Sequence, residues 1–280
     1  SRKRLRRSNP LPSGSTTSTP EDSKLTAAYV KNIVVTSGRT YDWSKFNDTK
    51  TGNFDSARED VFHYAVYGDR YSNGSSSGLA QVSGEPRVGD SFLVTQGAWS
   101  GGFSRRQEAG TFMHELGHTL GLKHGGGDDY RYKPNYQSIM NYSWQMGGRP
   151  LGYSSSVPQE LYEDALWEGA GLPGADGVFS WYCRKPGAPG TVDTPAGYIK
   201  RTQSGSGPVD WDCDGTIEEV VAADVNGDLG TLLTGFDDWS GLKFDGGAVG
   251  VFNGADLGDQ DPPPTNTAAD DPEPCRGDRP

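Results

Sequence analysis

Residues 114–124 of this chain read HELGHTLGLKH, and this stretch constrains its fold and its chemistry more than any other. The whole sequence holds four histidines, and three of them lie here, at His114, His118 and His124. On an α-helix, His114 and His118 lie one turn apart and about 40° around the axis, so both imidazoles can reach one metal ion. Glu115 lies about 60° from His118 around the same helix, where it can hold a water molecule beside the open side of the metal.

His124 can join the other two ligands only if the helix ends before it. On a continued helix, His124 would point about 240° away from His118. Gly121 can adopt the left-handed backbone conformation that such a turn requires. Three neutral imidazoles leave a tetrahedral zinc ion with one position for water, as in catalytic rather than structural zinc sites. An accidental motif on a solvated helix, and a metal site that has lost its activity, are the alternatives.

The zinc motif resembles the long zinc signature of the metzincin clan of metalloendopeptidases. The resemblance implies that His114, His118 and His124 bind zinc and that Glu115 is the general base. The clan's families differ at the residue after the third histidine, which is Gly125 here. The resemblance therefore identifies the clan and not the family.

A second string, Ser138-Ile-Met-Asn-Tyr142, looks like the Met-turn of the same clan. The resemblance implies that Met140 lies beneath the metal. Tyr142 stands two residues after the methionine, as in astacin-like and serralysin-like members, where the phenol helps to stabilise the transition state. Tyr142 is thus a candidate catalytic residue.

The resemblance also implies a fold and a function. The expected fold is α+β, a metzincin-like catalytic domain with a twisted mixed sheet, a zinc-binding helix and an irregular C-terminal half. The expected protein is a secreted, monomeric zinc endopeptidase, a hydrolase that cleaves peptide bonds in protein or peptide substrates with metal-activated water. Two other functions stay open. They are a non-catalytic adhesion or matrix-binding module stabilised by zinc and calcium, and a zinc-dependent hydrolase of a substrate other than a peptide.

Local patterns predict the elements around the motif. Ser104 and Gln107 have the spacing of a capping box, which predicts a helix over residues 105–120. Apolar runs predict strands at residues 31–36, 61–67, 78–82 and 91–96, and the last of these is the expected edge strand for an extended substrate. A short helix is expected near residues 159–168. His63 lies in a predicted strand and is expected to be a core or barrel-face residue rather than a ligand.

A second candidate metal site begins at Asp210. Asp210, Asp212 and Asp214 occupy positions 1, 3 and 5 of an EF-hand-like loop, and Gly215 occupies position 6. Position 12, where a bidentate glutamate belongs, is Val221. The loop is therefore incomplete, and a calcium site and a solvated acidic loop both stay open. The residues that could supply the missing oxygens to calcium are Asp224, Asn226 and Asp228.

Composition excludes some classes of partner. The 280 residues carry 37 acidic and 26 basic side chains, a net charge of −11, and 17 of the acidic residues lie from Arg201 onward. This acidic chain lacks the basic surface that nucleic-acid binding needs. No apolar run approaches the roughly 18 residues of a transmembrane helix. We therefore expect no nucleic-acid partner and no membrane span.

The three cysteines lie far apart, without a C-x-x-C pair. A Cys183–Cys213 disulfide with Cys275 left over, and three reduced thiols, are both compatible with this spacing.

The chain divides into four expected parts. Residues 1–20 form a basic low-complexity tail that is expected to be disordered. Residues 21–124 form an upper catalytic subdomain that ends with the zinc motif. Residues 125–260 form a lower subdomain with the Met-turn and the acidic region. Residues 261–280 form a Pro/Asp-rich tail without expected structure.

Overall fold

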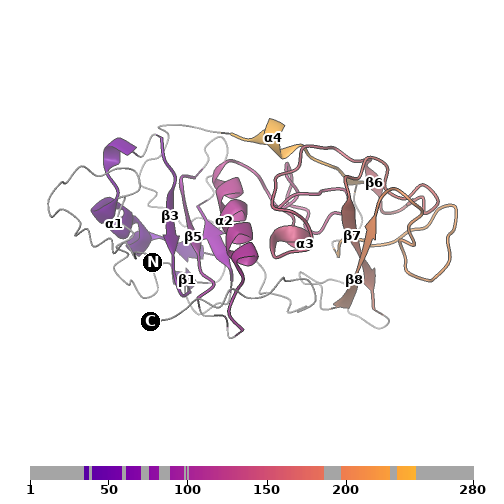
Figure 1. Ribbon diagram of the computed structural model, residues 1–280, viewed down its shortest axis with the longest axis horizontal. Coiled ribbons are helices and arrows are strands. Elements are labelled where there is room, and N and C mark those ends of the chain that lie inside the picture. The colour runs from indigo at the N-terminus through magenta and orange to yellow at the C-terminus, as the bar shows by residue number, and fades with distance from the viewer. Residues whose placement is uncertain are drawn as a thin grey trace, which may run out of the picture.

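The structure is a computed structural model, and it describes residues 35–37, 40–58, 61–70, 76–81, 89–97, 99, 101–185, 197–227 and 232–243. The two predicted tails lie outside the described residues, as do Asp228, Cys275 and most of the strand predicted at residues 31–36. Within the described parts the chain is α+β, with short helices and small sheets, which is compatible with a metzincin-like domain (Figure 1).

A three-stranded mixed sheet forms the core of the first half. Strand β5 (Ser91–Val94) pairs in parallel with β3 (Tyr64–Tyr67) and in antiparallel with β4 (Gly78–Ala80). The prediction that residues 91–96 form an exposed edge strand is therefore wrong, because β5 is the central strand and all of its residues are buried. Phe92 and Val94 face one apolar cluster and Leu93 faces another, so β5 is apolar on both faces.

A helix packs on each face of this sheet. Helix α1 (Ser44–Asn53) contributes Phe46 to the cluster with Leu93, and helix α2 (Arg105–Thr119) contributes Phe112 and Leu116 to the cluster with Phe92. Helix α1 was not predicted, because Phe46 is its one apolar side chain and it therefore has no repeating apolar pattern. The remaining elements of this half are the hairpin of β1 (Val35–Ser37) with β2 (Thr40–Asp42), and the short 3-10 helix η2 (Ser56–Arg58).

Helix α2 confirms the prediction made from Ser104 and Gln107. The Ser104 hydroxyl accepts a hydrogen bond from the Gln107 backbone N–H at 3.2 Å, and the Gln107 side chain accepts one from the Ser104 N–H at 2.8 Å. These two bonds satisfy amides that the first turn of a helix leaves without partners. Gln96, just after β5, donates to the Thr111 hydroxyl at 2.7 Å and so ties the sheet to the middle of the helix.

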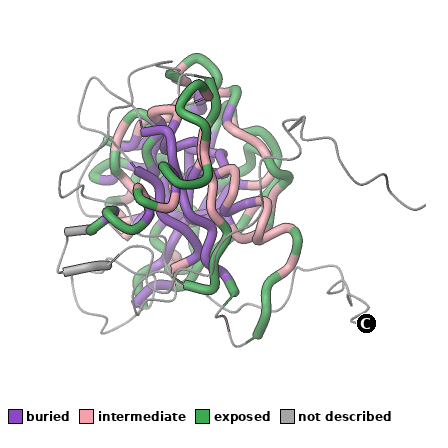
Figure 2. The backbone as a smooth tube through the Cα atoms, turned by 90° about the vertical axis from the view of Figure 1, so that its left-hand side faces the viewer, coloured by how far each residue is buried: buried purple, intermediate pink, exposed green. Residues whose placement is uncertain are grey.

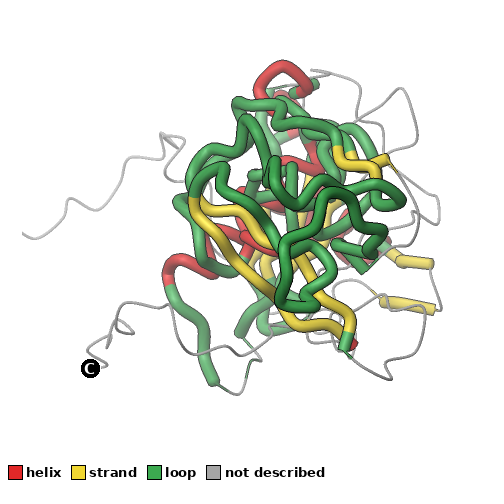
Figure 3. Tube along the Cα trace, turned by 90° about the vertical axis from the view of Figure 1, so that its right-hand side faces the viewer, coloured by secondary structure: helices red, strands yellow, loops and turns green. Residues whose placement is uncertain are grey.

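The second half consists mostly of loops (Figure 3). Its regular elements are α3 (Tyr142–Gln145), the pair β6 (Leu161–Tyr162) and β9 (Leu232–Leu233), the ribbon of β7 (Val178–Arg184) and β8 (Tyr198–Ser204), and α4 (Asp238–Gly241). The short helix predicted near residues 159–168 is wrong, because Leu161 pairs with Leu233 in a strand and turns follow.

A Cys183–Cys213 disulfide joins the ribbon to the acidic loop, beside a core that contains Trp181 and Trp211. Of the two open alternatives for the cysteines, the structure therefore has the disulfide.

Helix α2 stands between the two halves (Figure 1), and buried chain runs through the centre of the molecule (Figure 2). The Arg106 guanidinium donates to the carbonyls of Trp144, Gln145 and Arg149, each at 3.0 Å, and so joins α2 to the chain around α3. No helix among the described residues is long and apolar enough to cross a membrane.

The capping box gives a first prediction. Replacing Ser104 with Ala leaves the Gln107 amide without its acceptor, so we expect the free energy of unfolding to fall by about 1 kcal/mol in urea titrations. Ser104→Asp, which keeps an acceptor at the same place, should retain most of the stability. If both variants lost the same free energy of unfolding, the acceptor at position 104 would not be what stabilises α2.

Candidate metal centre

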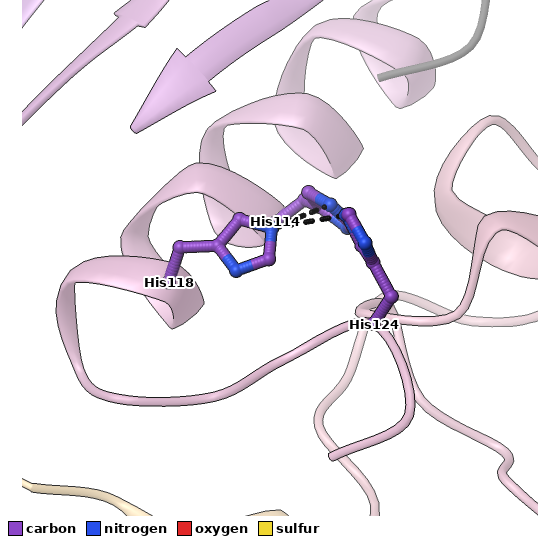
Figure 4. Close-up of side chains that lie close together, drawn as sticks. All are labelled: His114, His118 and His124. Carbon is purple, nitrogen blue, oxygen red and sulfur yellow. Dashed lines mark hydrogen bonds between the residues drawn. The ribbon is translucent and has the colours of Figure 1, made fainter. Parts of the chain in front are cut away.

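Helix α2 carries two of the three clustered histidines on one face. His114 and His118 are both buried, and their Nε2 atoms lie 3.1 Å apart. The Nε2 atom of His124, from the loop after the helix, lies 3.2 Å from that of His118. Figure 4 shows the three rings converging from the helix and the loop. The cluster that the sequence predicted is therefore present.

Backbone carbonyls fix the protonation of the two helix histidines. The Nδ1 atom of His114 lies 3.0 Å from the carbonyl oxygen of Ile139, and that of His118 lies 2.8 Å from the carbonyl oxygen of Leu122. A carbonyl only accepts hydrogen bonds, so each Nδ1 carries the proton and each Nε2 keeps its lone pair. This is the tautomer that binds metal through Nε2.

The spacing of the Nε2 atoms fits a zinc ion. Lone pairs that face one another at 3.1 Å repel unless a cation lies between them. Zinc–nitrogen bonds of about 2.0–2.1 Å in tetrahedral geometry place two nitrogen ligands about 3.3 Å apart. The observed separations of 3.1 and 3.2 Å are close to that value. His114, His118 and His124 are therefore a suitable ligand set for zinc.

Gly121 is the residue at which the chain leaves the helix. Its φ of 86° lies in the left-handed region, as the sequence predicted. The Leu122 N–H then bonds back to the Gly117 carbonyl at 2.9 Å, which closes the end of the helix. Lys123 and Gly126 exchange backbone hydrogen bonds of 2.8 Å around His124. This tight turn brings the third histidine back toward the first two.

Glu115 is completely buried between α2 and the sheet. Its carboxylate lies against β4 at Gly78, where an added Cβ atom would stand 2.4 Å from the Glu115 Oε1 atom. The strand can approach the carboxylate this closely because Gly78 has no side chain. Because the side chain is buried, the carboxylate of Glu115 is held in one position. Glu115 follows directly after His114, the first histidine of the cluster.

Met140 packs against helix α2, and its predicted place beneath the metal stays a prediction. The residue is fully buried, and a Cβ atom added to Gly117 would stand 2.2 Å from the Met140 sulfur. Asn141 then accepts a hydrogen bond from the Ser143 N–H at 3.0 Å and so begins α3 at Tyr142.

Tyr142 lies beside the histidine cluster. Its ring centroid is 4.1 Å from that of His124 and 5.6 Å from that of His114. The Arg131 guanidinium lies over the Tyr142 ring, 5.7 Å from its centroid. The cation gives the phenol a positively charged neighbour that no motif in the sequence indicated.

The acidic loop brings its carboxylates into two groups. Asp210 and Asp212 lie near the buried Glu168, and Asp212 and Asp214 lie near Glu218. Asp224 instead accepts hydrogen bonds from the Tyr198 hydroxyl at 2.5 Å and the Gly227 N–H at 2.7 Å, and Asn226 donates to the Arg131 carbonyl at 3.1 Å. Among the described residues, Asp224 is in neither acidic group.

Many oxygens of this loop accept hydrogen bonds from backbone N–H groups. Those of Asp210 accept from Asp214 and Gly215, and those of Glu168 accept from Trp211 and Glu218. Desolvation by burial is the main cause that raises the pKa of Asp212. The calcium site stays a prediction.

His63 is apart from the cluster. It lies just before β3, half-buried, and belongs to no three-ligand group of the described chain. Desolvation lowers its pKa, against a smaller opposing effect of Asp90. His63 is thus half-buried rather than fully buried, and it lies just outside the strand in which the sequence placed it.

Comparisons with known proteins agree with the geometry over part of the chain. Residues 17–125 match a family model described as metallo-peptidase family M12B, reprolysin-like. The match covers less than half of the chain and ends one residue after His124, so Met140 and Tyr142 lie beyond it. Neither the curated proteins nor the solved structures yielded a match. The family match and the histidine cluster together support a metzincin-like zinc metallopeptidase at a coarse level.

The turn at Gly121 gives a second prediction. Gly121→Ala places a side chain in the left-handed region, which should lower the free energy of unfolding by roughly 1–2 kcal/mol. It should also weaken zinc binding, since the turn carries His124. Urea titration and competition with a chelator measure the two effects.

Gly101→Ala is the matched control, because Gly101 precedes the same helix with open space around its Cα and no positive φ. It should change stability by less than about 0.5 kcal/mol. A Gly121→Ala protein that behaves like this control would contradict the role of the turn.

Proposed function

We propose that this chain is a zinc-dependent endopeptidase that hydrolyses peptide bonds in protein substrates. The observation that carries the proposal is the convergence of three Nε2 atoms, with the carboxylate-bearing Glu115 next in sequence to the first ligand. The reprolysin-like match supports peptidase chemistry over the same residues. The non-catalytic adhesion module is not favoured, because the family match and the histidine cluster both point to peptidase chemistry.

In this proposal His114, His118 and His124 hold the zinc ion. When bound, zinc would lower the pKa of water to about 7 and polarise the substrate carbonyl. Glu115 takes a proton from the attacking water and then passes it to the leaving amine nitrogen. No side chain forms a covalent bond to the substrate.

Tyr142 is proposed to act on the oxyanion. Its ring lies against His124, and the hydroxyl can donate a hydrogen bond to the carbonyl oxygen as negative charge develops there. The positive charge of Arg131 near the ring makes an anion on this side of the site more favourable. The proposal thus gives Tyr142 the role that the phenol has in the Met-x-Tyr members of the clan, which the sequence resembles.

The proposed protein is secreted. The Cys183–Cys213 disulfide supports this localisation, because disulfides persist in oxidising compartments. Proteins of the matched family are typically extracellular, which agrees with it.

The third prediction tests Glu115. Glu115→Gln keeps the size of the side chain but removes its basicity, so we expect zinc to remain bound while cleavage of casein falls by several orders of magnitude. Elemental analysis measures the zinc, and a chelator-treated wild-type sample gives the background rate. Substantial cleavage by a zinc-loaded Glu115→Gln protein would refute the role of this carboxylate.

The fourth prediction tests Tyr142. Tyr142→Phe removes one hydroxyl donor, so kcat should fall by about ten- to a hundredfold with little change in KM. Tyr162→Phe is the control, because Tyr162 is a solvent-exposed tyrosine on β6. Unchanged kinetics in Tyr142→Phe would reduce Tyr142 to a packing residue.

A further inference from the structure

Asp238 is a buried carboxylate that lies 114 residues after the last histidine of the cluster, in the short helix α4. Its Oδ1 atom accepts a hydrogen bond from the Tyr136 hydroxyl at 2.6 Å. Its Oδ2 atom accepts from the Ser138 hydroxyl and from the Ser154 N–H, the latter at 2.8 Å. Its own N–H donates to the Ser154 carbonyl at 3.0 Å. One side chain thus joins three points of the lower half.

These bonds surround the carbonyl that orients His114. Ser138 links Asp238 to Met140, because its hydroxyl also accepts a hydrogen bond from the Met140 N–H at 3.1 Å. Ile139 lies between these two residues, and its carbonyl is the partner of the His114 Nδ1 atom. The Ile139 N–H bonds to the Gly152 carbonyl at 2.9 Å, two residues before Ser154. Asp238 is therefore connected to the backbone around Ile139 by two routes, through Ser138 and through the chain at Ser154.

The chain around Asp238 also holds the exit of the zinc helix. The Lys243 N–H donates to the Leu120 carbonyl at 2.8 Å. Leu242 packs with Leu122, whose carbonyl orients His118. The Phe236 ring lies against Gly126, in the turn that follows His124. Residues 236–243, which we call the C-terminal segment, thus contact the supports of all three histidines.

The negative charge of Asp238 does not stabilise the folded chain. Desolvation is the largest cause that acts on this carboxyl, and it raises the pKa above the ordinary value although the three hydrogen bonds oppose the shift. An ionised carboxylate with a raised pKa is less stable in the folded chain than in the unfolded chain. What Asp238 contributes is therefore the position of its two oxygens, which accept hydrogen bonds from three places in the chain.

We propose that Asp238 is a positioning residue for the metal site, which sets the Ile139 carbonyl, and through it the His114 imidazole, in the zinc-binding orientation. The inference rests on the proposed function only in requiring that the three histidines bind zinc. Removal of an outer partner of a metal-bound histidine commonly weakens metal binding by ten- to a hundredfold.

The test compares variants by zinc affinity and not by cleavage. Zinc is titrated into each apoprotein in competition with a coloured chelator, and thermal melting is recorded for the apo and zinc-loaded forms. Asp238→Ala leaves the Tyr136, Ser138 and Ser154 donors without their acceptor and should weaken zinc binding by ten- to a hundredfold. Asp238→Asn can accept from Ser138 and Ser154 and donate to Tyr136, so it should bind zinc within a few-fold of wild type.

Two further variants keep the test decisive. If Asp238→Ala does not fold, the double variant Tyr136→Phe/Ser138→Ala removes two of the three bonds with little loss of volume, and should weaken zinc binding about tenfold. Asp90→Ala is the control. It removes a buried carboxylate that contacts Lys50 and Ser91 in the upper half, so it should lower the melting temperature without changing zinc affinity.

The inference is overturned if Asp238→Ala, or the double variant in its place, binds zinc as wild type does. It is also overturned if Asp90→Ala weakens zinc binding to the same extent, because the effect would then be general instability. This test measures zinc affinity and not cleavage. A protein that binds zinc without hydrolysing peptides would therefore contradict the proposed function, and the comparison of zinc affinities would still test the inference.

Discussion

Two backbone carbonyls, those of Leu122 and Ile139, control the chemistry of the histidine cluster. Each accepts the Nδ1 proton of one helix histidine, at 2.8 and 3.0 Å, and so leaves the Nε2 lone pair for a metal. The two carbonyls come from different places, one from the end of α2 and the other from the chain beneath it. The three nitrogens can form one site only if the chain leaves the helix at Gly121 and the segment of residues 138–142, which we call the Met140 segment, lies against the helix.

Close packing of helix α2 against its neighbours depends on two glycines, one in the helix and one in strand β4. Gly117 leaves room for the Met140 sulfur, and Gly78 leaves room for the Glu115 carboxylate on the other side. The Arg106 guanidinium fastens the same helix to the chain around α3 by three carbonyl bonds. Helix α2 is thus held from both halves of the molecule. Rigid support of this kind keeps the buried ligands in the orientation that a metal site needs.

The match to known peptidases ends at Gly125, and several groups that support the site lie after that residue. The reprolysin-like match ends at Gly125 and includes all three histidines with Glu115. The Leu122 carbonyl, which orients His118, lies inside the match. The Ile139 carbonyl, which orients His114, and the groups around it lie after that point, in residues 136–154 and in the C-terminal segment. The matched part thus supplies the donor atoms, and the unmatched part supplies much of their placement. The acidic loop at Asp210 belongs to this unmatched part, where its carboxylates and Glu168 bind neighbouring backbone N–H groups.

The sequence by itself determined the zinc helix, its capping box, the turn at Gly121 and the identity of the clustered histidines, because these depend on spacings within about twenty residues. It did not determine that β5 is a central strand, that residues 161–162 pair with β9, or that α1 is a helix around Phe46. Local patterns predict which residues are apolar but not which segments pair over long distances. Only the tertiary structure decided that Asp238 lies behind the Met140 segment, because a single carboxylate a hundred residues from its partners has no local signal.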